Sequence, residues 1–418
     1  MDPRPLIMKL PSRLLPLTLL LSLLLPPGPV SRIHATTAEP ADTFRLAPDS
    51  SNFVKASLMI AEPLTAIYSV FGHATLRMEC PMHHLDYVFT FESDPDVSAF
   101  MTGIAGTATA KFVPVPAEVY IEDARKMGRE LWQYELNLNL HEKQNLWRML
   151  DEETAAGAYR HFNLLYTNCL TTSILSVQRC LIGERFEWGE MRFPQTLNDG
   201  DLFRYTLRHA PWSEFLFITF GGSAYGLTSI REYRLTPESI IQMLRDARII
   251  DDATGGSRHV VTDPGQQLVK GTPKPSSPLT PTVVFGALLV ITLLITAAER
   301  WLRWKRLARV YDIILFTAQA LIFALMVYMT FASEMFNSYW NWYFIATFPL
   351  PLLLLFHRPS PTVTRLWLVY SIVLALFILA TPFIALLDLP HQLVTATFLT
   401  RSLSHYFSTN RQTRNLSY

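Results

Sequence analysis

The sequence YTNCLTTSILSVQRCLIG, residues 166–183, predicts the helix on which the N-terminal half of the fold is built. Asn168 is a residue type that often caps helix N-termini, and apolar residues follow it at near-helical spacing as far as Leu181. Gly183 is suited to ending such a helix. Cys169 would occupy the first turn, where unpaired backbone N–H groups favour a thiolate. The stretch therefore predicts a helix that carries a reactive cysteine at its start.

The first 35 residues have the features of an export signal. Arg4, Lys9 and Arg13 supply positive charge around the start of an almost unbroken apolar run, Leu14–Leu25. Prolines end this run, and Ala35 offers a small residue for cleavage. An uncleaved N-terminal anchor helix is the alternative. Either way, we expect the domain that follows to lie outside the cytoplasm.

Charge and cysteine content narrow the possible functions. The chain has 418 residues and a formal net charge of +1, so nothing in its charge suggests a nucleic-acid partner. Its three cysteines leave one odd thiol if two of them pair. Cys80 and Cys180 could form a disulfide in an oxidising compartment and leave Cys169 free. An arrangement with no disulfide is equally compatible with the sequence.

The composition changes at GTPKPSSPLTP, residues 271–281, a linker rich in proline and serine. Residues 36–270 before it have the composition of a soluble domain of mixed α and β structure. Residues 282–410 after it hold four apolar stretches and a weaker fifth that contains Arg401. A membrane span needs roughly 20 apolar residues. We therefore expect four or five transmembrane helices, near residues 282–299, 310–331, 342–356, 366–387 and 390–407.

Basic residues predict the orientation of these helices. The segment ERWLRWKRLAR, residues 299–309, follows the first span, and basic loops remain in the cytoplasm. The soluble domain and the aromatic loop at 332–344 are then expected outside. In that loop, Glu334, Asn337 or Asn341 could line a substrate groove. Alternatively, the loop is an aromatic belt at the membrane interface.

A second motif lies upstream of Cys169. The stretch IYSVFGHATLRM, residues 67–78, predicts a turn at Gly72 and a strand that begins with His73. HLDYVFTF, residues 84–91, predicts the next strand of a hairpin. A histidine on a strand can serve as the base for a distant cysteine, and a third group orients its ring. The candidates for this third group are Asp86, His84 and His83.

The motifs FGHATLR and YTNCLTT resemble those of a bacterial envelope family associated with lipoprotein N-acylation in Bacteroides-type bacteria. The resemblance covers about residues 55–240, and the apolar tail fits it. It implies an α+β fold: a circularly permuted papain-like domain of the NlpC/P60 type, followed by a four- or five-helix transmembrane bundle. The Asn-Cys pair and the order of His73 before Cys169 also resemble lecithin:retinol acyltransferase-like enzymes.

This resemblance implies a multi-pass acyltransferase of the bacterial inner membrane with its catalytic domain in the periplasm. Cys169 would be the nucleophile and His73 the base. Asp86, which aligns with an aspartate of the family, would be the third residue, and Tyr166 could pack under the site. The acyl donor would be a phospholipid and the acceptor the N-terminal amine of a lipoprotein. The reaction would require no metal or soluble cofactor.

Two other functions remain compatible with the same residues. A thiol amidase or peptidase that cuts peptidoglycan peptides would use the same pair, Cys169 and His73, with water as the acceptor. A scaffold without catalytic activity would use Cys169 only for packing. The four or five membrane helices favour acyl transfer, because a cell-wall hydrolase has no obvious use for them.

Overall fold

The computed structural model describes residues 53–66, 69–93, 99–163, 167–188, 199–222, 237–262, 264–272, 277–333, 335, 341–384 and 386–416. The predicted export signal, Tyr166, Glu334 and Asn337 lie outside these residues.

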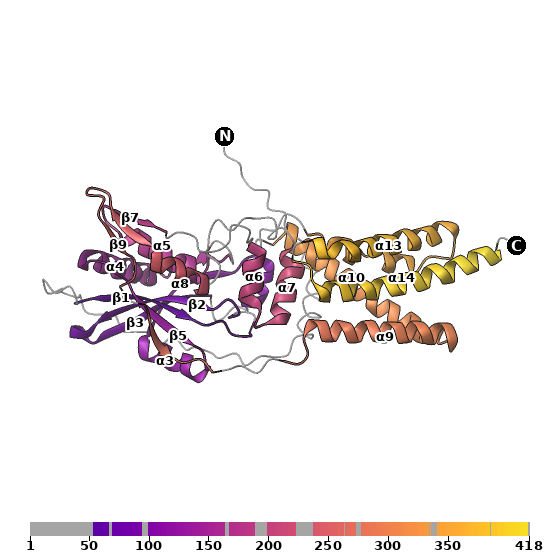
Figure 1. The fold of residues 1–418 in the computed structure, drawn as a ribbon, viewed down its shortest axis with the longest axis horizontal. Coiled ribbons are helices and arrows are strands. Elements are labelled where there is room, and N and C mark those ends of the chain that lie inside the picture. Colours follow the sequence, from indigo (N-terminus) through magenta and orange to yellow (C-terminus); the bar gives the residue numbers. More distant parts are fainter. Residues whose placement is uncertain are drawn as a thin grey trace. The chain divides into compact units, whose positions relative to one another are not determined.

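A seven-stranded antiparallel sheet, in the order β10-β5-β1-β2-β3-β4-β6, forms the centre of the soluble part (Figure 1). The strands are β1 Lys55–Ala61, β2 His73–Cys80, β3 Leu85–Ser93, β4 Thr109–Pro116, β5 Leu131–Glu135, β6 Arg160–His161 and β10 Gln266–Val269. The predicted hairpin is confirmed: β2 pairs with β3, and the short turn η1, Pro81–His83, joins them.

Helices cover both faces of this sheet because both faces are largely apolar (Figure 1). On one face, α5 (Cys169–Cys180) packs on β2 and β3, and α4 (Leu140–Ala156) packs on α5 and β4; they bury residues such as Val177 and Leu146. On the other face, α3 (Ala117–Lys126) packs against Met59 and Val88. The remaining helices of this half are α2 (Ala99–Ala105) and α8 (Pro237–Asp246). The mixed α and β character predicted for this region is confirmed.

Helix α5 starts at the predicted residue. The side chain of Asn168 accepts a hydrogen bond from the N–H of Thr171 at 2.9 Å, and the Thr171 hydroxyl bonds the N–H of Asn168 at 2.9 Å. This reciprocal cap is worth about 0.5–2 kcal/mol. The helix ends at Cys180, earlier than predicted, because Leu181 is extended and Gly183 forms the next turn with a φ of +67°.

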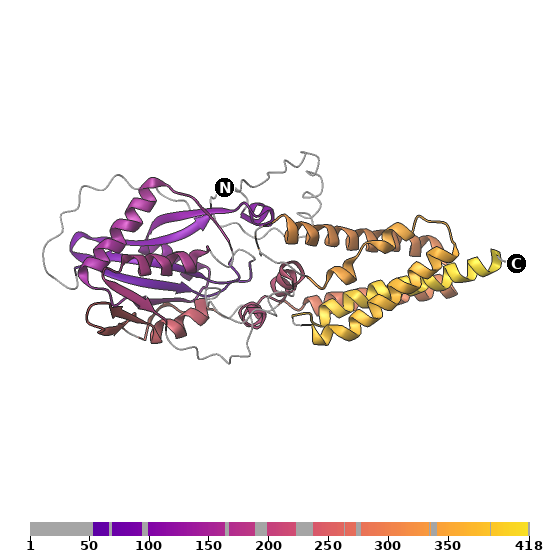
Figure 2. The ribbon, with the colours of Figure 1, turned by 90° about the horizontal axis from the view of Figure 1, so that it is seen from above.

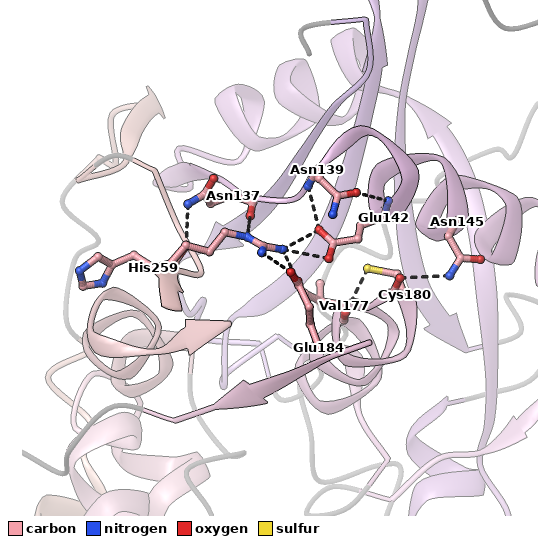
Figure 3. A network of polar contacts seen from close by, with 9 residues as sticks. Asn137, Asn139, Glu142, Asn145, Val177, Cys180, Glu184 and His259 are labelled. Atoms are coloured by element: carbon pink, nitrogen blue, oxygen red, sulfur yellow. Dashed lines mark hydrogen bonds and ion pairs between the residues drawn. The ribbon is translucent and has the colours of Figure 1, made fainter. Parts of the chain in front are cut away.

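A small sheet made of β7 (Glu184–Glu187), β8 (Arg248–Asp251) and β9 (Ser257–His259) is held to α4 by ion pairs (Figure 3). The guanidinium of Arg258 donates to the carboxylate of Glu142 at 2.8 Å and to that of Glu184 at 2.5 Å. Burial raises the pKa of Glu142, whereas the hydrogen bond from Arg258 lowers the pKa of Glu184. The network therefore holds the small sheet to α4, the neighbour of α5, which carries Cys169.

All three cysteines are free thiols, so the possible pairing of Cys80 with Cys180 does not occur. Both lie in the core between the sheet and the helices. The Cys180 thiol donates to the carbonyl of Val177 at 3.1 Å, and burial raises its pKa to about 12. Cys169 is the only cysteine that is partly exposed.

Within the described residues, three helices are long and apolar enough to cross a membrane: α9 (Pro281–Trp301), α10 (Lys305–Phe331) and α13 with the turn that follows it (Pro361–Phe383). The last helix, α14 (Leu389–Leu416), contains the weak fifth stretch and runs beside α13 (Figures 1 and 2). These helices follow four of the five predicted stretches.

The stretch predicted as a span at 342–356 is divided into two short helices, α11 (Phe344–Thr347) and α12 (Leu350–Leu354). Pro349 and Pro351 break it, because proline has no N–H to continue a helix. The Tyr370 hydroxyl lies 3.2 Å from the carbonyl oxygens of both Ala346 and Phe348, so its one hydrogen is shared between them. Such partners are required for irregular backbone among membrane helices.

Helices α6 (Asp199–Leu207) and α7 (Pro211–Gly221) share a hydrophobic core with the membrane helices, although they were predicted as part of the soluble domain. The apolar sequence of α7, PWSEFLFITFG, explains this association. Asn341 donates to the carbonyl of Thr219 at 2.7 Å, and the Thr219 hydroxyl lies 3.2 Å from Nε2 of His391. Asn341 is buried and therefore anchors α7 instead of lining a groove.

A buried ion network joins α9, α10 and α14. Arg401 on α14 donates to both carboxylate oxygens of Asp312 on α10, at 2.5 and 2.7 Å. It also pairs with Glu299 on α9 at 2.9 Å, while His405 lies 2.8 Å from Asp312. Arg401 and Asp312 are 0% and 1% exposed. The charge that made the fifth stretch a weak prediction is thus paired inside the bundle.

We predict that Arg401→Met lowers the free energy of unfolding by about 3–5 kcal/mol, because Asp312 is left buried without its main partner. Chemical unfolding in detergent micelles measures this loss. Arg411→Met is the matched control, since Arg411 lies exposed on the same helix. Equal stability of the two variants would show that the network does not hold α14 in place.

Candidate active site

His73 is the first residue of β2 and follows a tight turn. Gly72 has a φ of +83°, a conformation that favours glycine, and its N–H bonds the carbonyl of Ser69 at 3.1 Å. Phe71 packs edge-to-face on Phe203 of α6 and Phe217 of α7, with ring centroids 5.8 and 4.9 Å apart. The position of His73 is therefore set by the sheet on one side and by the membrane-associated core on the other.

A chain of hydrogen bonds orients the imidazole. Nε2 of His73 lies 2.7 Å from the hydroxyl of Thr90, and that hydroxyl donates to Glu92 at 3.0 Å. Because the hydroxyl hydrogen is given to Glu92, Thr90 accepts from an Nε2–H of His73. This tautomer leaves Nδ1 of His73 with its lone pair free to take a proton.

Asp86 does not hold the position predicted for it. It pairs across the hairpin with Glu79, whereas His73 lies six residues before Glu79 on the same strand, roughly 20 Å away. The Asp86 carboxylate instead forms a two-pronged ion pair with Arg77 at 2.7 and 2.8 Å. The prediction of Asp86 as the orienting residue is therefore wrong, and Thr90 has that position.

His83 and His84 are also too far along the hairpin to orient the His73 ring. Both are exposed and lie at the turn between β2 and β3, at the end opposite His73. His84 has a φ of +54°, and His83 packs edge-to-face on Phe53. These contacts give the two histidines a role in the turn.

Cys169 lies at the same end of the sheet as His73. It begins α5, which packs on β2 and β3. Its thiol interacts with the backbone N–H of Ala74, the residue that follows His73, and with the N–H groups of Leu170 and Cys169 itself. His73 on β2 and Cys169 on α5, which are far apart in sequence, therefore lie at the same end of the sheet.

Burial favours the neutral form of both groups. Burial raises the pKa of the Cys169 thiol, against the backbone N–H groups and the charge of Arg129, which lower it. Burial, assisted by Arg129, lowers the pKa of His73 to about 3. A fall in pH from 7 to 5 therefore leaves the His73 base unprotonated, whereas an ordinary histidine would become charged over that range.

Three further side chains surround the pair, and the sequence motifs did not identify them. Arg129 precedes β5, Tyr120 lies on α3, and Glu92 lies on β3. Burial raises the pKa of Tyr120 to about 12, and both Arg129 and Cys169 also influence it. Among the described residues, no group of three or more His, Cys, Asp or Glu side chains could hold a metal ion.

The chain tethers this end of the sheet to the membrane helices. Thr272 bonds the carbonyl of Gly128 through its N–H at 3.0 Å, and α9 begins nine residues later at Pro281. Nine residues reach at most about 30 Å. The loop that follows β1 is held as well, because His209, just before α7, lies 3.1 Å from the carbonyl of Leu64.

Two family models match the chain. The model of the Lnb N-terminal periplasmic domain matches residues 42–198, and that of the Lnb transmembrane domain matches residues 273–413. Helices α6 and α7 lie between the two matched regions. No curated protein and no solved structure matches the chain significantly. The chain therefore belongs to the Lnb-type family, that of the Bacteroides lipoprotein N-acyltransferases, with a periplasmic domain followed by a transmembrane region.

Proposed function

We propose that the protein transfers an acyl chain from a phospholipid, through a thioester on Cys169, to the N-terminal amine of a lipoprotein. The observation that carries this proposal is that an oriented base and a helix-start thiol lie at the same end of the sheet. His73 presents a free Nδ1, and the Cys169 thiol lies against the N–H of the residue next to His73. Membership of the family supports the same chemistry.

In the first half of the reaction, Nδ1 of His73 takes the proton of the Cys169 thiol as the sulfur attacks the ester carbonyl carbon. A carbon–sulfur bond forms, and the carbonyl oxygen becomes an oxyanion. The N–H groups at the start of α5 are placed to stabilise it. Collapse of this intermediate breaks the carbon–oxygen bond, and His73 gives its proton to the departing lysophospholipid.

In the second half, the lipoprotein amine attacks the thioester carbon. His73 takes a proton from the amine, the carbon–sulfur bond breaks, and Cys169 leaves as a thiolate that regains the proton. An amide forms on the lipoprotein and the enzyme returns to its neutral resting state. The neutral forms of Cys169 and His73, which burial favours, suit this cycle. Neither half of the reaction then begins with a charged side chain that has to be neutralised first.

A lipid donor suits the attachment of the site. The tether between Thr272 and Pro281 keeps the catalytic end of the sheet within about 30 Å of the first membrane helix. We place the protein in the bacterial inner membrane as a multi-pass protein, with the basic segment after α9 in the cytoplasm and the catalytic domain in the periplasm. A peptidoglycan amidase with the same pair of residues is the second candidate.

A deletion strain distinguishes the two candidates. Mass spectrometry should show lipoprotein N-termini without the N-acyl chain, with muropeptides unchanged. The wild-type gene should restore the acyl chain, and Cys169→Ser should not, because the serine hydroxyl is a much weaker nucleophile in this setting. Cys180→Ala, which removes a thiol outside the site, is the control and should restore it. Altered muropeptides with normal lipoproteins would instead support the amidase.

We also predict that Thr90→Val slows acylation of Cys169 about tenfold or more, because the His73 tautomer with a free Nδ1 is no longer enforced. Thr90→Ser keeps the hydroxyl and should retain most of the rate. The rate of thioester formation by the purified protein, normalised to folded protein, provides the measurement. Equal rates for the valine and serine variants would contradict the role assigned to Thr90.

A further inference from the structure

Arg129 lies at the catalytic end of the sheet by strand register. Leu131 of β5 pairs with Ala61 of β1, and Ala61 pairs with His73 of β2. These three residues form one row across the sheet, and Arg129 stands two residues before Leu131, just ahead of β5. Its charge acts on His73, so the guanidinium and the imidazole lie at the same end of the sheet.

The position of Arg129 is fixed by its own contacts. Its backbone N–H bonds the carbonyl of Ala124 at 2.9 Å, and its Nε donates to the carbonyl of Glu62 at 2.7 Å. The N–H of Glu62 in turn bonds the carbonyl of Glu130 at 2.9 Å. The guanidinium is thus held at one edge through Nε.

One of these nitrogens has no acceptor. Nη2 of Arg129 is buried and makes no hydrogen bond, and within the described part of the chain Arg129 forms no ion pair. By contrast, the buried Arg401 uses all three of its nitrogens. A buried charged donor without a partner is costly, so its presence beside reactive groups indicates a site for a ligand.

The charge of Arg129 does not serve to activate the two catalytic groups. It favours the Cys169 thiolate but opposes a protonated His73. Formation of a thiolate–imidazolium pair therefore gains little from it. Tyr120, Cys169, Glu62 and Glu92 also interact with this charge. Nη2 of Arg129 nevertheless has no acceptor within the described part of the chain, so a donor remains for an anion from outside the chain.

We propose that Arg129 binds the phosphate diester of the acyl donor, which makes the site selective for phospholipids over neutral glycerolipids. This inference rests on the acyl transfer proposed above. A guanidinium matches the geometry of phosphate oxygens and binds them through paired N–H groups. The oxyanion already has donors at the start of α5, so Arg129 is available for the head group. In a glycerophospholipid only a few covalent bonds separate the phosphate from the ester that Cys169 would attack.

Binding is tested first in a Cys169→Ala background, where no acyl transfer can occur. The full-length protein in detergent micelles is titrated with dihexanoyl phosphatidylethanolamine and, separately, with dihexanoylglycerol. Arg129→Gln should weaken phospholipid binding about tenfold or more and leave binding of the neutral lipid unchanged. Arg129→Lys should retain part of the affinity, because it keeps the charge. Arg125→Gln is the matched control, since Arg125 is exposed and pairs with Glu122 on α3.

The same substitutions are then made with Cys169 intact, and adduct formation is measured from each lipid. Arg129→Gln should slow acylation by the phospholipid and not by the neutral lipid. Equal loss with both lipids, or no loss with either, would overturn the phosphate assignment. If the Arg129→Gln protein does not fold, the acylation rates of Arg129→Lys and wild type with the two lipids are compared instead, and this comparison tests the phosphate assignment. If the Cys169→Ala protein binds phospholipid selectively but the protein with Cys169 forms no adduct from any lipid, the acyl-transfer proposal is refuted and the phosphate assignment stands.

Discussion

The edge-to-face packing of Phe71 on Phe203 and Phe217 connects the catalytic end of the sheet to the membrane-associated core. Phe71 stands two residues before His73, and its neighbour Val70 is fully buried in the same core. The two aromatic partners come from α6 and α7, and Thr219 on α7 is bonded by Asn341 and His391 of the membrane half. A soluble enzyme could hold its histidine by the sheet alone. Here the histidine also depends on helices that pack with the membrane spans.

Arg401 and Arg129 show how differently one residue type is used in the two halves. Arg401 is surrounded by Asp312, Glu299 and Thr296, so its charge is fully compensated and its role is to join helices. Arg129 is anchored through Nε only and keeps a buried donor unpaired. An arginine whose charge is fully paired serves to hold helices together, whereas an arginine with an unpaired donor beside a thiol and an imidazole indicates a site that binds an anion. This contrast supports a ligand-binding role for Arg129 and a structural role for Arg401.

Local patterns in the sequence predicted the parts of the site that depend on local structure. The helix start at Cys169 follows from the capping residue Asn168, and the strand start at His73 follows from Gly72. Both predicted elements begin at the expected residue. The fit of the chain to a papain-like topology stays a prediction, as does the crossing of the membrane by α14.

Residues placed by long-range pairing were missed. Thr90 comes next to His73 only through the β2–β3 register, in which Thr75 pairs with Thr90. Counting outward from the turn at Pro81 would have indicated this pairing and excluded Asp86. Arg129 depends on two further strand pairings, β5 with β1 and β1 with β2, and no local pattern reports them. The break at Pro349 was readable from the sequence, because two prolines in an apolar stretch argue against one continuous helix.

The proposed mechanism requires that Cys169 carry the acyl chain as a thioester. Intact-mass spectrometry of the purified full-length protein, incubated with phospholipid and no acceptor, detects this adduct. We expect a gain of one acyl chain on Cys169, removed by neutral hydroxylamine because thioesters react with it and amides do not. A lipoprotein with a free N-terminal amine should discharge the same adduct. Absence of any adduct, from a folded protein that still acylates lipoproteins, would contradict the covalent mechanism.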